Sequence, residues 1–130
     1  MENKEAYYEA QKKRTRIYYR SIEKVFCHAL NKNVYFDDAG WRHFLYQRKG
    51  RRPIADQLRR FRLLSHAPNV LSDSPIASYR KFGSEKIVHL WSFVSLRNKT
   101  TIRVVVRQIN DGRAHYLSVM DKEHKHKSPQ

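Results

Sequence analysis

Hydrophobic positions follow a helical period through the first quarter of the chain. Residues 4–30 contain neither Gly nor Pro, and most of them are good helix formers. Apolar side chains recur at helical spacing at Ile17, Ile22, Val25, Phe26, Ala29 and Leu30. This spacing predicts one long N-terminal helix within residues 1–32. We expect its second half to pack on the core and its basic first half to project or to contact a partner.

A short extended piece at residues 34–36 leads into a second helix. Asp37 and Asp38 are suited to cap the N-terminus of that helix. Its apolar face is predicted to carry Trp41, Phe44 and Leu45. His43 lies about 200° around the helix from Trp41, so it points away from the apolar stripe.

Basic residues gather in the segment that follows. Between residues 42 and 62 there are eight Lys and Arg residues and a single acid, Asp56. Gly50 interrupts the helical pattern, and Pro53 suits the first turn of another helix. The buried side of that helix is predicted to hold Ile54, Leu58, Phe61 and Ser65.

After Pro68 the pattern changes to β-branched and alternating residues separated by turn signals. Four strands are expected, at about residues 76–82, 86–97, 101–109 and 114–120. Helices followed by an antiparallel meander define an α+β fold. We therefore predict one domain, with N-terminal helices, one of them long, packed on a four-stranded antiparallel sheet. Residues 33–120 form its core, and residues 121–130 form a flexible basic tail.

The last two strands have a predicted register, because Asp111 and Gly112 form a two-residue hairpin turn. In this register Arg107 opposes Tyr116. One face then carries Ile102, Val104, Val106, Leu117 and Val119 and is a core face. The opposite face carries Arg103, Arg107, Tyr116 and Ser118. Two arginines in the middle of a small sheet are difficult to explain by packing alone, so they need an anion or water.

Composition points to a polyanionic partner. The 130 residues include 27 Lys and Arg against 12 Asp and Glu, a formal net charge of +15. Nucleic acid is the default partner for such a field, although acidic membranes and acidic proteins respond to it as well. No run approaches the roughly 20 apolar residues of a membrane span, and the charged N-terminus is unlike a signal peptide. The single cysteine, Cys27, excludes an intramolecular disulfide and a cysteine-rich zinc site.

Arg107 is the strongest candidate for a phosphate contact, because a guanidinium presents a planar fork of donors. The alternative is an arginine on the solvated face of a one-sided sheet. Ser118 beside it is either polar filler or a phosphate donor. Tyr79 and Lys81 share one face of strand 76–82. They extend the same surface if that strand lies alongside, and otherwise form an exposed cross-strand pair.

Histidines matter because RNA cleavage needs no metal where one group accepts the 2′-hydroxyl proton and another protonates the leaving oxygen. His43 and His115 are the candidates. The predicted register turns His115 toward the core face, which favours His43. His89 shares a face with Trp91 and Phe93 and is interpreted as a core residue. The chain has no Gly-rich phosphate loop, paired-cysteine motif or carboxylate cluster, so we expect no cofactor and no metal.

The order of these features is similar to a known superfamily. The segments VYFDDAGWRHF, PNVLSDSPIASYRKF and IRVVVRQINDGRAHYLSV flank and follow a basic helical linker. Over residues 33–120 they resemble the barnase, EndoU, colicin and RelE-like ribonucleases, most closely the phage-type small RNase domains of toxin systems. The resemblance does not extend to the first helix. It implies N-terminal helices on a four-stranded antiparallel sheet, with RNA on the open face of the sheet.

The resemblance also implies roles for individual residues. The catalytic set would be His43, Arg107, Ser118, Tyr79 and Lys81. His43 would act as base or acid in a metal-independent attack of a 2′-hydroxyl that gives a cyclic phosphate. Arg107 and Lys81 would stabilise the charged phosphorane, and Ser118 would orient it. RNA would also contact Arg48, Lys49, Arg51, Arg52, Arg59, Arg103 and Tyr116. No second acid or base is assigned.

The expected function is an RNase toxin that acts on tRNA or another structured RNA. It would act in the cytoplasm, as one half of a toxin and antitoxin pair or as the tip of a secreted toxin. Its inhibitor would be an acidic antitoxin or immunity protein. Two alternatives remain: a non-catalytic RNA-binding or ribosome-associated module, and a basic adaptor whose long helix binds a protein.

Overall fold

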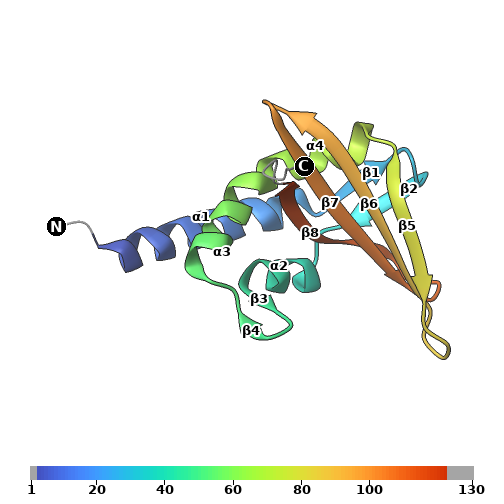
Figure 1. The fold of residues 1–130 in the computed structure, drawn as a ribbon, viewed down its shortest axis with the longest axis horizontal. Coiled ribbons are helices and arrows are strands. Elements are labelled where there is room, and N and C mark those ends of the chain that lie inside the picture. Colours follow the sequence, from blue (N-terminus) through green and yellow to red (C-terminus); the bar gives the residue numbers. More distant parts are fainter. Residues whose placement is uncertain (1–2, 123–130) are drawn as a thin grey trace, which may run out of the picture.

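The computed structural model describes residues 3–122, in which helices cover one face of a six-stranded mixed sheet (Figure 1). The strands lie in the order β1-β2-β8-β7-β6-β5. The helical elements are α1 (Lys4–Ile22), α2 (Asp38–Leu45), α3 (Ile54–Leu63), the 3-10 turn η1 (Leu64–His66) and α4 (Ala67–Asp73). The sheet strands are β1 (Lys24–Cys27), β2 (Lys32–Tyr35), β5 (Ile76–Phe82), β6 (Val88–Arg97), β7 (Thr100–Ile109) and β8 (Ala114–Lys122). The short strands β3 (Tyr46–Gln47) and β4 (Gly50–Arg51) pair separately between α2 and α3.

The second half of the chain forms the expected antiparallel meander, with each strand within two residues of its predicted bounds. The sheet is larger than predicted, because β1 and β2 extend it beyond β8. β2 runs parallel to β8 through the pairs Val34 with Ala114 and Tyr35 with His115. The predicted α+β class is therefore confirmed, but the prediction of a four-stranded antiparallel sheet is wrong.

The predicted long helix is also too long. α1 ends at Ile22, where Glu23 adopts a positive φ of 60°, and the next residues form β1. Burial along β1 alternates, with Cys27 fully buried and Phe26 exposed. A short apolar run satisfies a helical and an extended pattern equally well, and here pairing with β2 decides. Of the predicted tail, residues 121 and 122 belong to β8, and residues 123–130 lie outside the described part of the chain.

An aromatic cluster forms the part of the core between the helices and β8. Tyr116 is 0% exposed and stacks on Phe36 at 4.7 Å between ring centroids. Tyr19 and Phe44 pack around the same ring. At Gly40, a Cβ would collide with the Tyr19 hydroxyl and the Tyr116 ring. Glycine there lets α2 approach β8 closely, which fixes the position of the α2 side chains.

The helix α3 buries a different set of residues from the one predicted. Phe61 is buried, but Ile54 is 42% exposed and Ser65 is exposed as well. The buried position between them is a polar residue, Gln57, whose side-chain amide donates to the Arg52 carbonyl at 2.8 Å. Its Oε1 accepts a hydrogen bond from the buried Tyr8 hydroxyl. These two bonds satisfy the buried amide and connect α3 to α1.

The register of β7 and β8 changes in the middle of the hairpin. Val105 pairs with Ser118 as predicted, but a shift follows, and Arg107 pairs with His115 instead of Tyr116. β8 therefore has one more residue than β7 at this point, a β-bulge. Because an extra residue inverts the alternation of faces, Tyr116 turns into the core and His115 turns out beside Arg107. The predicted placements of Tyr116 and His115 are therefore wrong, and so is the predicted two-residue turn at Asp111 and Gly112, which would pair Arg107 with Tyr116.

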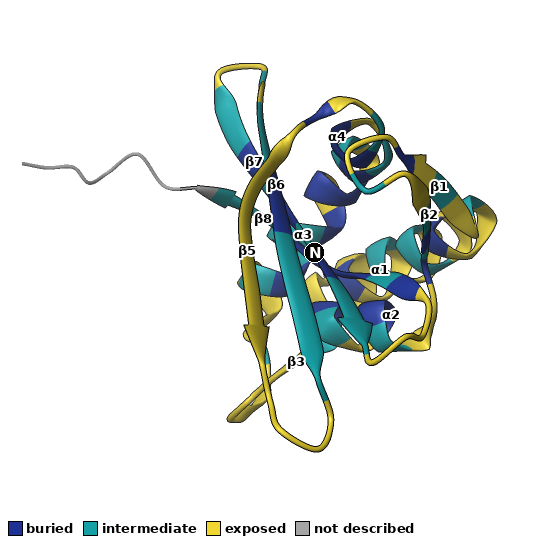
Figure 2. Cartoon of the chain, turned by 90° about the vertical axis from the view of Figure 1, so that its right-hand side faces the viewer, coloured by how far each residue is buried: buried dark blue, intermediate teal, exposed yellow. Residues whose placement is uncertain are grey.

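Burial differs strongly across the sheet. β5 is exposed along its whole length, whereas β7 alternates between buried and half-buried positions over its middle and β8 is buried throughout residues 116–119. Figure 2 shows β5 as an uncovered edge, with the helices on one side of the other strands.

Candidate functional site

One face of the sheet carries basic and hydroxyl side chains, and we call it the arginine face. It is defined by Arg103 and Arg107 of β7 and by His115 and Ser118 of β8. Arg107 pairs with His115, and Ser118 pairs with Val105, which lies between the two arginines. The intervening β7 residues Ile102, Val104 and Val106 are buried on the opposite face. The separation of polar and apolar residues on β7 is thus as the alternating pattern predicts.

Arg107 contacts a histidine rather than a carboxylate. Its Nε donates to His115 Nε2 at 3.1 Å, and within residues 3–122 the guanidinium forms no ion pair. The other ring nitrogen, His115 Nδ1, lies 3.9 Å from Asp37 Oδ2. Because Nε2 accepts a hydrogen bond, the proton of the neutral ring is on Nδ1, facing Asp37. Asp37, Arg107 and His115 therefore form one chain of contacts.

Burial lowers the pKa of His115 below its ordinary value, and the positive charges of Arg107 and Arg113 lower it further. The carboxylate of Asp37 acts in the opposite direction but does not reverse the effect. The ring is therefore mostly neutral at pH 7, with a basic lone pair on Nε2 that Arg107 occupies in the free protein.

His43 faces the same cationic region from α2. Its pKa is also lowered, first by burial and then by the charges of Arg107, Arg52 and Arg60, with a contribution from His115. Its ring makes no hydrogen bond to any other residue in the described part of the chain. The two histidines thus come from different elements, and the charge of Arg107 helps to lower the pKa of both.

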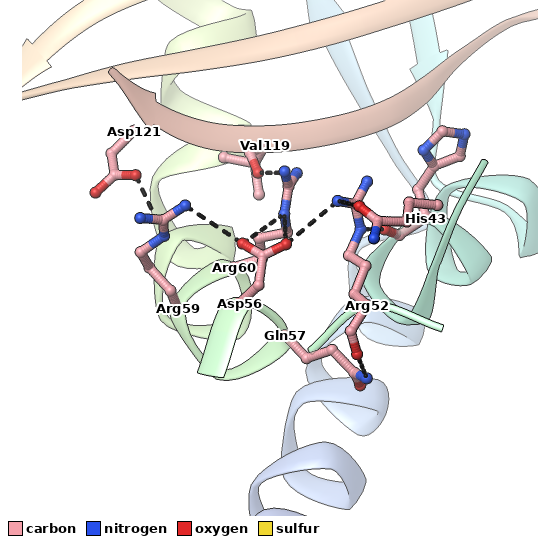
Figure 3. Close-up of polar contacts among 9 residues, drawn as sticks. His43, Arg52, Asp56, Gln57, Arg59, Arg60, Val119 and Asp121 are labelled. Atoms are coloured by element: carbon pink, nitrogen blue, oxygen red, sulfur yellow. Dashed lines mark hydrogen bonds and ion pairs between the residues drawn. The ribbon is translucent and has the colours of Figure 1, made fainter. Parts of the chain in front are cut away.

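A second group of basic side chains surrounds one carboxylate at the start of α3. Asp56 accepts from Arg52 at 3.2 Å, from Arg59 at 3.3 Å and from Arg60 at 3.3 Å. Arg60 also donates to the Val119 carbonyl on β8 at 3.1 Å (Figure 3). We call these four residues the Asp56 cluster. Its single carboxylate faces three guanidinium groups, which leaves a local excess of positive charge.

The Asp56 cluster positions His43 and opens to solvent. Arg52 Nε donates to the His43 carbonyl at 2.7 Å, which ties the end of α2 to the segment before α3 (Figure 3). The cluster also lines an open groove of about 680 Å³ together with Arg62 and Gln47. The Arg52 side chain is held by its contacts with Asp56 and with the His43 carbonyl. The Arg59 side chain is 39% exposed, and its Nε lies 3.5 Å from Asp121 Oδ1.

The remaining predicted basic residues lie on the β3–β4 hairpin. Arg48 and Lys49 form its exposed tip. Arg51 is also exposed, but its guanidinium donates to the Tyr8 hydroxyl at 3.3 Å and lies over the Tyr8 ring. The hairpin therefore adds positive charge at the end of α2, and Arg51 is directed toward α1.

Two hydroxyl residues lie on the arginine face. Ser118 is 8% exposed, and its side chain makes no hydrogen bond to another residue in the range 3–122. Ser92 of β6 accepts a hydrogen bond from Arg103 Nη1 at 3.2 Å and bonds to Ser78 of β5 at 2.6 Å. Arg103 is therefore held in place by a neutral partner, as Arg107 is.

Tyr79 and Lys81 lie on the opposite face of the sheet from Arg107. Tyr79 pairs with Trp91, which pairs with the buried Val106. In an antiparallel sheet directly paired residues share a face, so the row of Tyr79 continues the core face beyond the helices. The expectation that Tyr79 and Lys81 extend the surface of Arg107 is therefore wrong. Of the predicted catalytic set, the structure brings together His43, Arg107 and Ser118.

Sequence reasoning named His115 as a candidate but turned it toward the core, and it missed Asp37 as a member of the site. The signal was present, because a two-residue turn without a bulge puts Tyr116 outside and His115 inside, which is the less favourable arrangement for both side chains. Adjacent apolar residues at Tyr116 and Leu117 also break strict alternation, as a bulge does. Both observations favoured a shifted register.

Comparison of the chain with protein-family models, curated proteins and solved structures finds no match. Function is therefore argued from the site. Among residues 3–122, no helix is long and apolar enough to cross a membrane. The same part of the chain holds no group of three or more His, Cys, Asp or Glu side chains arranged around a metal position.

Proposed function

We propose that this protein is a metal-independent endoribonuclease. The observation that carries the proposal is the meeting of two histidines with lowered pKa, His43 and His115, at an arginine that has no carboxylate partner among the described residues. Cleavage of RNA through its own 2′-hydroxyl requires a base, an acid and a cation for the phosphate. Arg107 and His115 on the arginine face and His43 on α2 supply these three groups in the proposal.

The general base is His115. Its Nδ1 faces Asp37 Oδ2 at 3.9 Å and its Nε2 already accepts from Arg107, so Nε2 is the acceptor of the 2′-hydroxyl proton. A bound phosphodiester competes for the Arg107 guanidinium, since a charged acceptor binds it more strongly than a neutral imidazole does. When Arg107 turns to the phosphate, the Nε2 lone pair is released.

The general acid is His43. The 2′-oxygen forms a bond to phosphorus, the bond from phosphorus to the 5′-oxygen breaks, and His43 gives its proton to that leaving oxygen. The product is a 2′,3′-cyclic phosphate and a free 5′-hydroxyl. The surrounding cations make protonated His43 a strong acid, and the negative charge of the bound phosphate favours its protonation.

Arg107 stabilises the charge that develops on the phosphorane, and the Ser118 hydroxyl is placed to donate to one of its oxygens. Arg59, the most exposed arginine of the Asp56 cluster, and the basic side chains of the β3–β4 hairpin contact the RNA backbone. Binding therefore weakens steeply with salt. Lys81 has no part in this step, because it lies on the other face of the sheet.

The biological role is that of an RNase toxin acting on tRNA or another structured RNA. The net charge of +15 and the open basic surface favour an acidic inhibitor that covers the arginine face, as an antitoxin or immunity protein does. A protein of this kind is expected to copurify with the chain and to protect RNA from it.

The deciding experiment incubates the purified chain with tRNA and total RNA in EDTA. We expect fragments with cyclic phosphate ends, and loss of cleavage in His43→Ala, His115→Ala and Arg107→Ala. Arg20→Ala, which removes an exposed charge at the end of α1, is the matched control and should cleave normally. Intact RNA that binds with a steep salt dependence would contradict the proposal and favour a non-catalytic RNA-binding module. Weak, unsaturable RNA binding, with partner capture lost on deletion of residues 1–16, would favour the adaptor.

A further inference from the structure

Three aromatic rings form a compact triangular group on the sheet face opposite the arginine face. The rings of Tyr79, His89 and Trp91 have centroids 5.5 to 5.9 Å apart and planes inclined by only 14° to 31°. The Tyr79 hydroxyl and His89 Nδ1 are hydrogen-bonded at 2.7 Å. We call these three residues the aromatic ladder. The bond and the shared orientation hold the rings in one arrangement.

The aromatic ladder lies where the helices no longer cover the sheet. Tyr79 is 47% exposed on the edge strand β5, and His89 and Trp91 are half-buried on β6. Figure 2 shows this edge free of helices. A core role explains the inner edge of Trp91, which packs against buried residues, but it does not explain the exposed ring of Tyr79.

Cations and no carboxylates accompany the rings. Lys32 Nζ lies 5.8 Å from the centroid of the Trp91 ring and donates to Gln108 Oε1 at 3.0 Å. Lys81 is the cross-strand partner of His89. The strands β5, β6 and β7 contain no Asp or Glu. Rings with parallel planes beside lysines match the alternating bases and phosphates of a single strand.

We propose that the aromatic ladder, with Lys32 and Lys81, is a second RNA site that binds single-stranded RNA by stacking bases on its rings. In a duplex the base faces are already stacked and cannot reach the rings, so the site selects unpaired RNA. The proposal deepens the proposed nuclease and rests on it for the choice of RNA as the ligand. The site holds a flanking segment, while the arginine face holds the scissile phosphate.

The edge strand β5 offers a route between the two sites. Its side chains alternate, so Tyr79 and Lys81 lie on the aromatic side, and Arg80 lies on the side of Arg107, through the pairs Arg80 with Leu90 and Leu90 with Arg107. A strand of RNA that passes around this edge meets basic side chains on both sides. Retention of the flanking segment raises the local concentration of the scissile phosphate.

Binding is measured with a short fluorescein-labelled 2′-O-methyl RNA, which has no free 2′-hydroxyl and is not cleaved. We expect Tyr79→Ala and His89→Ala each to raise the dissociation constant about tenfold, since one stacked base contributes about that factor. Tyr79→Phe keeps the ring and should bind nearly as wild type. Tyr18→Ala removes a ring of similar exposure on α1 and is the matched control.

Tryptophan fluorescence gives a second measurement. The RNA should quench the emission of Trp91, and Trp91→Phe should remove the quenching, because Trp41 is only 4% exposed in the core. Circular dichroism of each variant confirms that it is folded.

The outcomes separate this proposal from the nuclease. Unchanged affinity in Tyr79→Ala and His89→Ala overturns the second site even if the chain cleaves RNA. An equal loss in Tyr18→Ala, or an equal dependence on Tyr79 with duplex RNA, overturns it too. Ladder-dependent binding by a chain that cleaves no RNA overturns the nuclease and leaves the second site in place.

Discussion

Two groups of basic side chains in this protein differ in how their charge is balanced. In the Asp56 cluster, Arg52 and Arg60 have side chains only 11% exposed and both contact the carboxylate of Asp56. On the arginine face, Arg107 contacts only the neutral ring of His115. The first group is held by charge pairing and connects α2, α3 and β8. The second keeps its charge available to an anion.

The difference teaches that an excess of positive charge does not show which arginine binds a ligand. The sequence segment 42–62 is the most basic in the chain, yet part of its charge stabilises the fold. Arg107 stands in a strand with few charges but has no competing carboxylate in the described residues. Five experiments test this contrast.

Removal of either histidine should have the largest effect. We expect His43→Ala and His115→Ala each to lower kcat by about 10²–10⁴-fold, the usual contribution of a general acid or base. Stability should change little, because both rings lie at the edge of the core. A single-turnover assay with tRNA measures the effect, and wild-type rates in both variants would contradict the assignment.

The pH dependence distinguishes the two histidines. Activity requires neutral His115 and protonated His43, and both pKa values are lowered below the ordinary value of 6.5. We therefore expect kcat/KM to fall as the pH rises above about 6.5. The residual activity of His43→Ala should lose the alkaline limb of the profile, and that of His115→Ala the acidic limb. An optimum above pH 8 would contradict both assignments.

Arg107→Ala should lower kcat by about 10²–10³-fold, the typical cost of removing one donor to a transition-state oxyanion. Its midpoint of chemical denaturation should stay near that of the wild type, because the lost hydrogen bond is to a neutral, half-buried group. Arg107→Lys should recover little activity, since an ammonium lacks the planar fork. A large loss of stability in Arg107→Ala would mean that the contrast between the two groups is false.

Asp56→Ala should show the reverse behaviour. It leaves three guanidinium groups without their shared acceptor, and we expect the free energy of unfolding to fall by about 2 kcal/mol. Urea denaturation measures this change. Cleavage measured well below the melting temperature should decrease less than in Arg107→Ala. Unchanged stability would show that the ion pairs of the Asp56 cluster are not structural.

The smallest effect is expected at the tip of the β3–β4 hairpin. Arg48→Ala should leave stability and kcat unchanged and weaken RNA binding modestly. If Arg48 contacts one phosphate, the slope of log Kd against log salt should decrease by about one. The same variant with a short RNA confined to the arginine face should bind normally. An unchanged slope with tRNA would exclude the hairpin tip from the RNA interface.

The sequence predicts the meander well because each of its strands is bounded by turn residues and carries an alternating pattern. It predicts residues 24–27 poorly, since their short apolar run suits a helix as well as a strand and only pairing with β2 decides. Fold class therefore follows from local pattern. The size of the sheet depends on contacts between distant segments.

The candidate site is predictable in the same uneven way. His43, Arg107 and Ser118 follow from helix and strand periodicity alone. His115 does not, because its face depends on a bulge, and a change of one residue in register inverts the face of every residue beyond it. Tyr79 and Lys81 share a face with each other, as predicted, but which face this is depends on pairing with β6.

The bulge in β8 lets one short strand meet two demands that ordinary alternation keeps apart. If the pairing of Val105 with Ser118 continued without the bulge, Arg107 would pair with Tyr116. Tyr116 would then leave the aromatic core, and His115 would turn away from the proposed phosphate site. Deletion of Leu117 removes the extra residue and leaves Tyr116 opposite Val106 and His115 opposite Arg107, so both side chains should keep their faces. The proposed active site thus tolerates loss of the extra residue better than a shift of the pairing itself.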